Sequence, residues 1–150
     1  MSEVSLRERT DSDRRDPAET AALGTMLFDL ARTGDTAELM GLVARGIPVD
    51  LRDAAGNSLL MMAAYHGHAA TVSALATRGA DVDRTNDLGQ TPLAGAVFKG
   101  HDEVVATLVA LGASAYLGTP SAVATAVAFG RTELELLLRG IRDGFTRGKE

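Results

Sequence analysis

The residues with the clearest potential for chemistry are three histidines, His66, His68 and His101. Neutral imidazole is a common zinc ligand and a general base near neutral pH, so a His-x-His pair is a candidate for either role. A metal site would need further ligands, and a catalytic base would need a nucleophile beside it. The chain has no cysteine, and no Asp or Glu stands at ligand spacing around the histidines. We therefore expect no bound metal and a structural role for His68 and His101, with the role of His66 left open.

The acidic segment at residues 81–92 is the next candidate, because its spaced carboxylates superficially suggest a calcium loop. A loop of the EF-hand type needs Asp or Asn at its fifth position, Gly at its sixth and Glu at its twelfth. Here these positions hold Thr85, Asn86 and Pro92. The carboxylates are therefore expected to cap turns and to keep the segment soluble, and not to bind an ion.

Motifs for catalysis or for cofactor binding are missing from the sequence. It contains no Gly-x-Ser-x-Gly, no phosphate loop and no dinucleotide fingerprint. The glycine-flanked residues 112–118 lack the Lys and Ser/Thr of a phosphate loop. Neighbouring carboxylates such as Asp102 and Glu103 suit the start of a helix, where negative charge complements the helix dipole. The sequence thus predicts no catalytic residue, no cofactor and no enzymatic activity.

Length and composition are those of an ordinary globular chain of one domain. The 150 residues are 45% apolar and 23% charged, and the formal net charge is −5. This acidic balance disfavours binding to nucleic acid or to anionic membranes, which both require a basic surface. The start of the chain lacks the apolar region of a secretory signal, and no apolar run approaches the roughly 20 residues that span a bilayer. We expect a cytoplasmic monomer that binds neither nucleic acid nor membrane.

The strongest pattern in the chain is a period of 33 residues. Glycines and leucines recur at this step: Gly34, Gly67 and Gly100; Gly46, Gly79 and Gly112; Leu27, Leu60 and Leu93; Leu42, Leu75 and Leu108. A period in this range indicates a repeat protein, in which each unit buries its apolar face only against its neighbours. Such a chain builds a long surface and no enclosed catalytic cavity, which favours binding of another macromolecule.

Each unit is predicted to contain two helices and a linker. Four residues stand where the N-cap of the first helix belongs: Thr25, Ser58, Thr91 and Ser121. This helix, about eight residues long, is expected to end at a glycine in the left-handed conformation: Gly34, Gly67, Gly100 or Gly130. A second, amphipathic helix follows, and a linker such as residues 80–83 leads to the next unit.

Three motifs are clearest in the central units: Thr-Pro-Leu-Ala at residues 91–94, Gly-His at 67–68 and 100–101, and Gly-Ala-Asp-Val-Asp at 79–83. Together they resemble the ankyrin repeat. The first is similar to that family's Thr-Pro-Leu-His helix start, with Ala94 in place of the histidine. The second matches its inter-helix Gly-His, and the third is similar to its Gly-Ala-Asp-Val-Asn closing segment. The resemblance covers about residues 20–142.

The resemblance implies an all-α fold, a solenoid of about four helix-turn-helix units joined by hairpin-like fingers. The predicted units span about residues 20–52, 53–85, 86–118 and 119–142. Residues 1–19 are densely charged and almost free of apolar side chains, so they are predicted to form a flexible arm. Residues 143–150 are predicted to form a C-terminal tail.

The outer units depart from the pattern and are predicted to act as caps, which shield the core of a repeat protein from water. The fourth unit begins three residues early, and the finger before it is shortened. Its second helix carries one apolar stripe, formed by Leu134, Leu137, Leu138, Ile141 and Phe145. Leu136 falls outside this stripe and is expected to be exposed.

The candidate binding positions are the two residues before each inter-helix glycine. In ankyrin-like stacks these end the first helix on the concave side and contact the partner together with the fingers. The resemblance therefore implies the following partner-binding residues: Arg32, Asn57, Tyr65, His66, Asp87, Leu88, Gln90, Phe98, Lys99 and Phe129. Tyr65 and Phe98 hold equivalent places in adjacent units, and exposed aromatics are frequent binding hot spots. The alternative is that both rings merely fill gaps between alanines.

The sequence predicts a non-catalytic protein–protein interaction module whose partner it does not identify. A second possibility is a small regulatory or inhibitory subunit that occludes the active site of a partner enzyme with the same surface. A weaker possibility is a ligand-binding or enzymatic protein that uses His66. An enzyme would need convergent polar groups, and none occurs at usable spacing.

Overall fold

The computed structural model describes residues 17–147 and, among them, the side chains of residues 17–140. The described residues form eight helices and no strand, which confirms the all-α prediction. In chain order the helices are α2 (Pro17–Thr33), α3 (Thr36–Ala44), α4 (Leu59–Tyr65), α5 (Ala69–Thr77), α6 (Pro92–Lys99), α7 (Asp102–Ala110), α8 (Ala122–Ala128) and α9 (Thr132–Arg147). None of them is long and apolar enough to cross a membrane.

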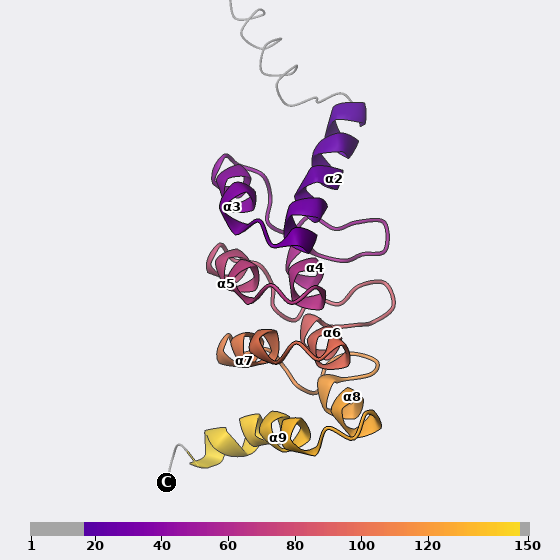
Figure 1. Cartoon of the computed structure of the whole chain (residues 1–150), viewed down its shortest axis with the longest axis vertical. Helices are drawn as coiled ribbons and strands as arrows, with labels where there is room; N and C mark the ends of the chain where they lie inside the picture. Colours follow the sequence, from indigo (N-terminus) through magenta and orange to yellow (C-terminus); the bar gives the residue numbers. More distant parts are fainter. Residues whose placement is uncertain (1–16, 148–150) are drawn as a thin grey trace, which may run out of the picture.

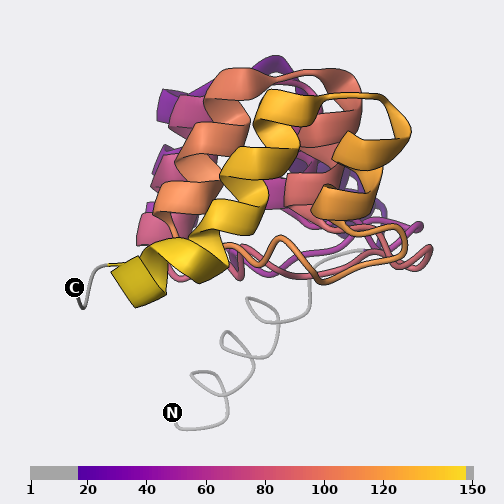
Figure 2. The same ribbon diagram turned by 90° about the horizontal axis from the view of Figure 1, so that it is seen from below.

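The helices pair in chain order and the four pairs stack in one row, as a solenoid (Figure 1). Helices α2, α4, α6 and α8 form one layer, called here the inner helices, and α3, α5, α7 and α9 form the other, the outer helices. Figure 2 looks along the stack and shows the loops between successive pairs along one edge of the two layers. These loops, called the fingers, are residues 45–58, 78–91 and 111–121. The third finger is shorter by three residues, as predicted.

Three of the four predicted N-caps are confirmed. Ser58 Oγ accepts a hydrogen bond from the backbone N–H of Met61 at 3.0 Å, and Thr91 and Ser121 accept equivalent bonds at 3.1 and 3.0 Å. Because each bond satisfies a backbone donor that the helix leaves free, these residues fix where α4, α6 and α8 begin.

The remaining N-cap prediction, Thr25 in the first unit, was wrong. Thr25 lies inside α2 and its hydroxyl donates to the backbone carbonyl of Ala21 at 3.0 Å. The helix begins at Pro17, with Glu19 in its first turn, and both residue types favour a helix start. Residues 17–19 are therefore helical, although the sequence had placed them in the charged arm. The rest of that arm, residues 1–16, lies outside the described residues.

The core is built from one set of positions repeated along the stack. Leu27, Leu60 and Leu93, one from each of the first three inner helices, are fully buried. Small residues from the same helices, such as Ala31 and Ala64, are also fully buried and let neighbouring helices approach closely. Leucines and valines of the outer helices complete the core: Leu39, Val72, Leu75, Val104, Val105, Leu108 and Leu138. The period of the leucines is thus the period of the stacked core.

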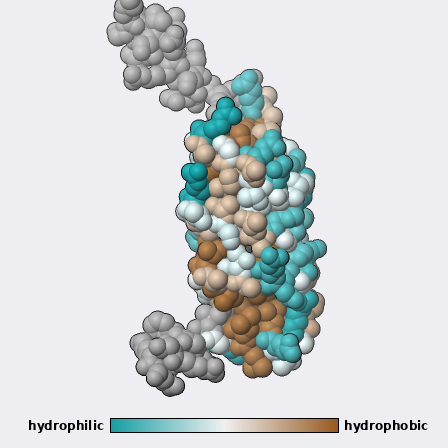
Figure 3. Space-filling model, turned by 60° about the vertical axis from the view of Figure 1, so that its left-hand side comes forward, coloured by the Kyte–Doolittle hydropathy of each residue, from teal (hydrophilic) through white to brown (hydrophobic). Residues whose placement is uncertain are grey.

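The fourth unit follows its predicted stripe only in part. Leu138 is fully buried and Leu134 packs against the core, but Leu137 is 51% exposed. This part of the prediction was wrong, because no further helix among the described residues covers that side of α9. Leu136 is 65% exposed, as expected, and hydrophobic surface gathers toward the α9 end of the stack (Figure 3). The side chains of Ile141 and Phe145 lie outside those described.

Helix α9 also continues past the predicted boundary at residue 142 and ends at Arg147. Glycine does not stop it, since Gly140 lies within the helix. An ion pair one turn apart supports the helix, with Arg139 Nε 2.8 Å from Glu135 Oε2.

Because stability in such a stack comes from contacts between neighbouring units, truncation of a central leucine should be costly. We expect Leu75→Ala or Leu108→Ala, which remove fully buried side chains, to lower the free energy of unfolding by about 2–5 kcal/mol. The matched control is Leu88→Ala at a finger tip, where the side chain is 74% exposed and the change should stay within about 0.5 kcal/mol. Equilibrium unfolding in urea measures all three. Equal losses at buried and exposed positions would contradict the described core.

Candidate functional site

Two of the three histidines join neighbouring units. His68 Nε2 lies 2.7 Å from the backbone carbonyl oxygen of Arg32, and His101 Nε2 lies 3.1 Å from that of Tyr65. A carbonyl oxygen can only accept, so both rings carry a proton on Nε2 and donate it. Each histidine thus ties the start of an outer helix to the end of the inner helix in the preceding unit. This agrees with the structural role expected of both residues.

The other side of each ring lies on a glycine. A Cβ atom built on Gly34 would lie 2.4 Å from Nδ1 of His68, and one built on Gly67 would lie 2.8 Å from Nδ1 of His101. Any larger residue would therefore push the histidine away. In the fourth unit Arg131 takes the place of the histidine and covers Gly100, with a guanidinium nitrogen 2.8 Å from the position of a Cβ. The same contact thus recurs along the fold: a side chain of one unit packs on the glycine of the preceding unit.

His66 has a different environment from the other two histidines. It is the exposed C-cap of α4, and its ring meets the ring of Tyr65 edge to face at a centroid distance of 5.6 Å. Burial lowers the pKa of His66, and the positive groups of its neighbours Arg32, His68, Lys99 and His101 lower it further. Its ring is therefore neutral at physiological pH. Within residues 17–140 no three His, Cys, Asp or Glu side chains lie close enough to hold a metal ion.

A hollow of about 380 Å³ lies between the inner helices of the second, third and fourth units and is called here the Phe98 hollow. Its lining is mainly apolar and consists of Met61, Tyr65, Gln90, Ala94, Gly95, Phe98, Pro120, Ala124, Thr125, Ala128 and Phe129. Four of the ten predicted binding residues belong to it: Tyr65, Gln90, Phe98 and Phe129. The structure therefore brings residues from three units together at one place.

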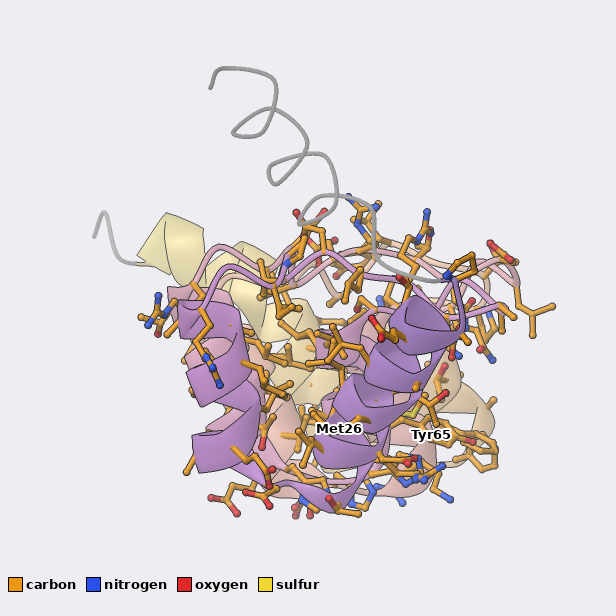
Figure 4. All side chains as sticks on the ribbon, turned by 90° about the horizontal axis from the view of Figure 1, so that it is seen from above. Met26 and Tyr65 are labelled. Atoms are coloured by element: carbon orange, nitrogen blue, oxygen red, sulfur yellow. The ribbon has the colours of Figure 1, made fainter. Side chains whose placement is uncertain are left out.

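A second hollow, of about 440 Å³, lies beside the first and is called the His66 hollow. It is lined by Arg32, Ala55, Asn57, Met61, Met62, Tyr65, His66, Asn86, Leu88 and Gln90. Tyr65, Met61 and Gln90 line both hollows. Figure 4 looks down the stack from α2 and shows Tyr65 on the side of the inner helices away from the outer helix α3. The two hollows together form a groove, bounded by the inner helices and the fingers.

The two aromatic residues proposed as equivalent differ in their packing. Phe98 is 52% exposed and its ring meets that of Phe129 edge to face at 5.4 Å. Tyr65 is half-buried, and a Cβ at Gly95 would lie only 3.3 Å from Cδ1 of its ring, so Tyr65 packs against α6. The gap-filling alternative therefore describes Tyr65 better than it describes Phe98.

The predicted finger residues divide into a pair whose side chains are hydrogen-bonded and a pair at the tip of a finger. The side chain of Asn86 donates to Asn57 Oδ1 at 2.9 Å and to Gln90 Oε1 at 2.8 Å, so both acceptors are held in place. Asp87 and Leu88 stand exposed at the tip of the second finger. The backbone N–H of Asp87 donates to the carbonyl of Ala55 at 3.0 Å, which joins adjacent fingers.

Eight of the ten predicted residues line one or both hollows, and Lys99 lies beside them with its amino group 5.1 Å from the centre of the Tyr65 ring. Asp87 lines neither. Three residues that line the Phe98 hollow were not predicted from the sequence: Met61, Ala94 and Ala124. These residues hold one position, three residues after the N-caps Ser58, Thr91 and Ser121. That shared register is the signal that could have identified them.

Comparison with known proteins identifies the family of this chain. Residues 27–119 match the family model of ankyrin repeats, in three copies. The ankyrin repeat protein PA3287 of Pseudomonas aeruginosa is 46% identical over 55 residues, which are 36% of this chain and 32% of that protein. The crystal structure of the human ASB11 ankyrin repeat domain superposes with a TM-score of 0.68 at 31% identity, covering 84% of this chain and 54% of that chain. The chain thus spans about a third of the first protein and about half of the second.

The contact between a histidine and a glycine can be tested with two glycines that have similar backbones but different surroundings. Gly67 has a φ of 86° and is covered by His101, whereas Gly112 has a φ of 88° and has no atom within 4 Å of a built Cβ. Gly67→Ala and Gly112→Ala therefore introduce similar backbone strain, but only the first displaces a ring. We expect Gly67→Ala to lower the free energy of unfolding by about 1–3 kcal/mol more than Gly112→Ala, measured by urea unfolding. Equal effects would mean that the ring does not couple the units.

Proposed function

Because the chain belongs to the ankyrin repeat family, we propose that it is a non-catalytic protein–protein interaction module that binds a partner protein on its groove and fingers. Ankyrin repeats generally act as interaction scaffolds, which gives the class of function. The location of the binding surface is our proposal. We also propose the cytoplasmic location and the monomeric state expected from the sequence.

The observation that best supports this surface is the exposed pair Phe98 and Phe129. Both rings are more than half exposed, at 52% and 57%, although large apolar side chains are normally buried in a stable core. Together with Tyr65 they line a concave apolar hollow, the kind of site in which a partner's side chain becomes fully desolvated. A partner that covers these rings would remove apolar area from water, which favours association.

The polar groups of the groove support binding better than catalysis. The amide side chain of Asn86 donates to those of Asn57 and Gln90, and these bonds shape the fingers. The ring of His66 meets the ring of Tyr65, and no carboxylate is among the charged groups that shift its pKa. A general base needs a positioned nucleophile or substrate proton within hydrogen-bond reach. These groups therefore suit recognition of a partner surface.

Replacement of Phe98 tests the proposal directly. Because the ring is half exposed, Phe98→Ala should leave the melting temperature nearly unchanged, while affinity for the partner protein should fall by about 2 kcal/mol or more, the range of binding hot spots. Leu136→Ala is the matched control, since this exposed leucine lies on α9 and lines neither hollow. It should change neither property.

Calorimetry with a partner isolated from the source cell by affinity purification measures the affinity, and thermal melting of the same samples measures stability. If Phe98→Ala binds as tightly as the parent protein, the groove is not the binding surface. If it melts much earlier, Phe98 belongs to the core and the loss of binding is indirect.

A further inference from the structure

The ends of the inner helices carry a row of basic groups beside the apolar hollows. Arg32, His66 and Lys99 lie at the ends of α2, α4 and α6, in a chain whose formal net charge is −5. Cations at helix C-termini complement the helix dipole, and this accounts for one basic residue at such a place. It does not account for a surface on which three successive units present basic groups toward one groove.

Among the described residues, an acidic group balances the charge of this row at Arg32 but not at Lys99. Every charged group that acts on His66 is basic: Arg32, His68, Lys99 and His101. Arg32 is paired with Asp29 on its own helix, but Lys99 has no acidic partner among the residues that the structure describes. The amino group of Lys99 lies over the ring of Tyr65 instead, 5.1 Å from its centre. The groove therefore offers an unpaired cation at its rim.

The unpaired cation and the apolar hollow are joined by one side chain. Tyr65 lies under Lys99 and lines both the Phe98 hollow and the His66 hollow. Phe98 precedes Lys99 directly in the chain. The volume of the Phe98 hollow, about 380 Å³, leaves room for a large side chain. A ligand that fills this hollow and contacts Tyr65 therefore lies near Lys99.

We propose that the groove recognises an acidic polypeptide segment of the partner protein, in which a large apolar side chain stands next to a carboxylate. This proposal rests on the proposed function. The apolar side chain enters the Phe98 hollow, between Phe98, Phe129 and Tyr65. The neighbouring Asp or Glu pairs with Lys99 and accepts a hydrogen bond from His66. Charge complementarity selects this occupant, because a basic segment would meet the positive charges of Arg32 and Lys99.

The test begins with a random peptide library selected on the immobilised full chain. Enriched peptides should place Asp or Glu beside a large apolar residue. Their affinity for the full chain, measured by calorimetry, should weaken by about tenfold with Lys99→Glu, because this change replaces attraction by repulsion. The matched control is Arg78→Glu, which makes the same change of charge at the exposed C-cap of the outer helix α5. Arg78→Glu should leave the affinity unchanged, and both variants should keep the parent melting temperature.

The pH dependence of binding gives a readout that a merely structural role of His66 would not produce. In the free protein the lowered pKa keeps His66 neutral at about pH 7.5, and a bound carboxylate raises that pKa. Affinity should therefore increase as the pH falls to about 5.5, where Asp and Glu of the peptide remain ionised. This gain reflects the proton that His66 takes up when the carboxylate binds. His66→Gln should remove this gain, and it leaves His68, His101, Arg32 and Lys99 in place.

The outcomes separate this inference from the proposed function. If the selected peptides carry no acidic residue, or if Lys99→Glu binds them as well as the parent does, the acidic ligand is wrong. If those same peptides still lose affinity with Phe98→Ala, the groove stands as the binding surface. If binding survives both Lys99→Glu and Phe98→Ala, or if no peptide is enriched, both proposals fail.

Discussion

The structure depends on one constraint, which is that no unit can bury its apolar face without a neighbour. The constraint takes a concrete form where a histidine of one unit lies on the glycine of the unit before it. Gly67 leaves room for the ring of His101 only because it has no Cβ, and His101 donates its Nε2 proton to the carbonyl of Tyr65. This pair of contacts ties the end of α4, where Tyr65 lies, to the start of α7 in the next unit.

The same constraint explains how the fourth unit differs from the others. Ala31, Ala64 and Val97 hold one position in the first three units and are fully buried, but Val127, which takes that position in the fourth unit, is 51% exposed. Gly130 likewise has nothing within 4 Å of a built Cβ, whereas Gly34, Gly67 and Gly100 are covered. No described helix follows α9, so the positions that face a next unit remain open. Exposure of Leu137 has the same origin.

Much of the fold could be predicted from the sequence because its determinants are local. The N-caps Ser58, Thr91 and Ser121 act within one helical turn, and the glycines act through their own backbone. The 33-residue step then sets which leucines share the core. Thr25 was misjudged because it holds the register of a cap while Pro17 supplies an earlier helix start.

The candidate groove was less predictable, because it depends on contacts between units. Phe98 and Tyr65 are equivalent in sequence, yet Gly95 makes room for the ring of Tyr65 and Phe129 meets the ring of Phe98 at the surface. A glycine inside a helix of the next unit decides this difference. The position of Met61 in both hollows likewise follows from the way α4 lies between its neighbours.

The central claim is that the inner helices and fingers, and not the outer helices, form the binding surface. Amide hydrogen exchange of the full chain, alone and with the library-selected peptide, tests it most directly, because exchange reports protection along the whole backbone. We expect slower exchange in the fingers at residues 78–91 and 111–121 and at the end of α6, with α5 and α7 unchanged. Protection confined to α5 and α7 would contradict the account.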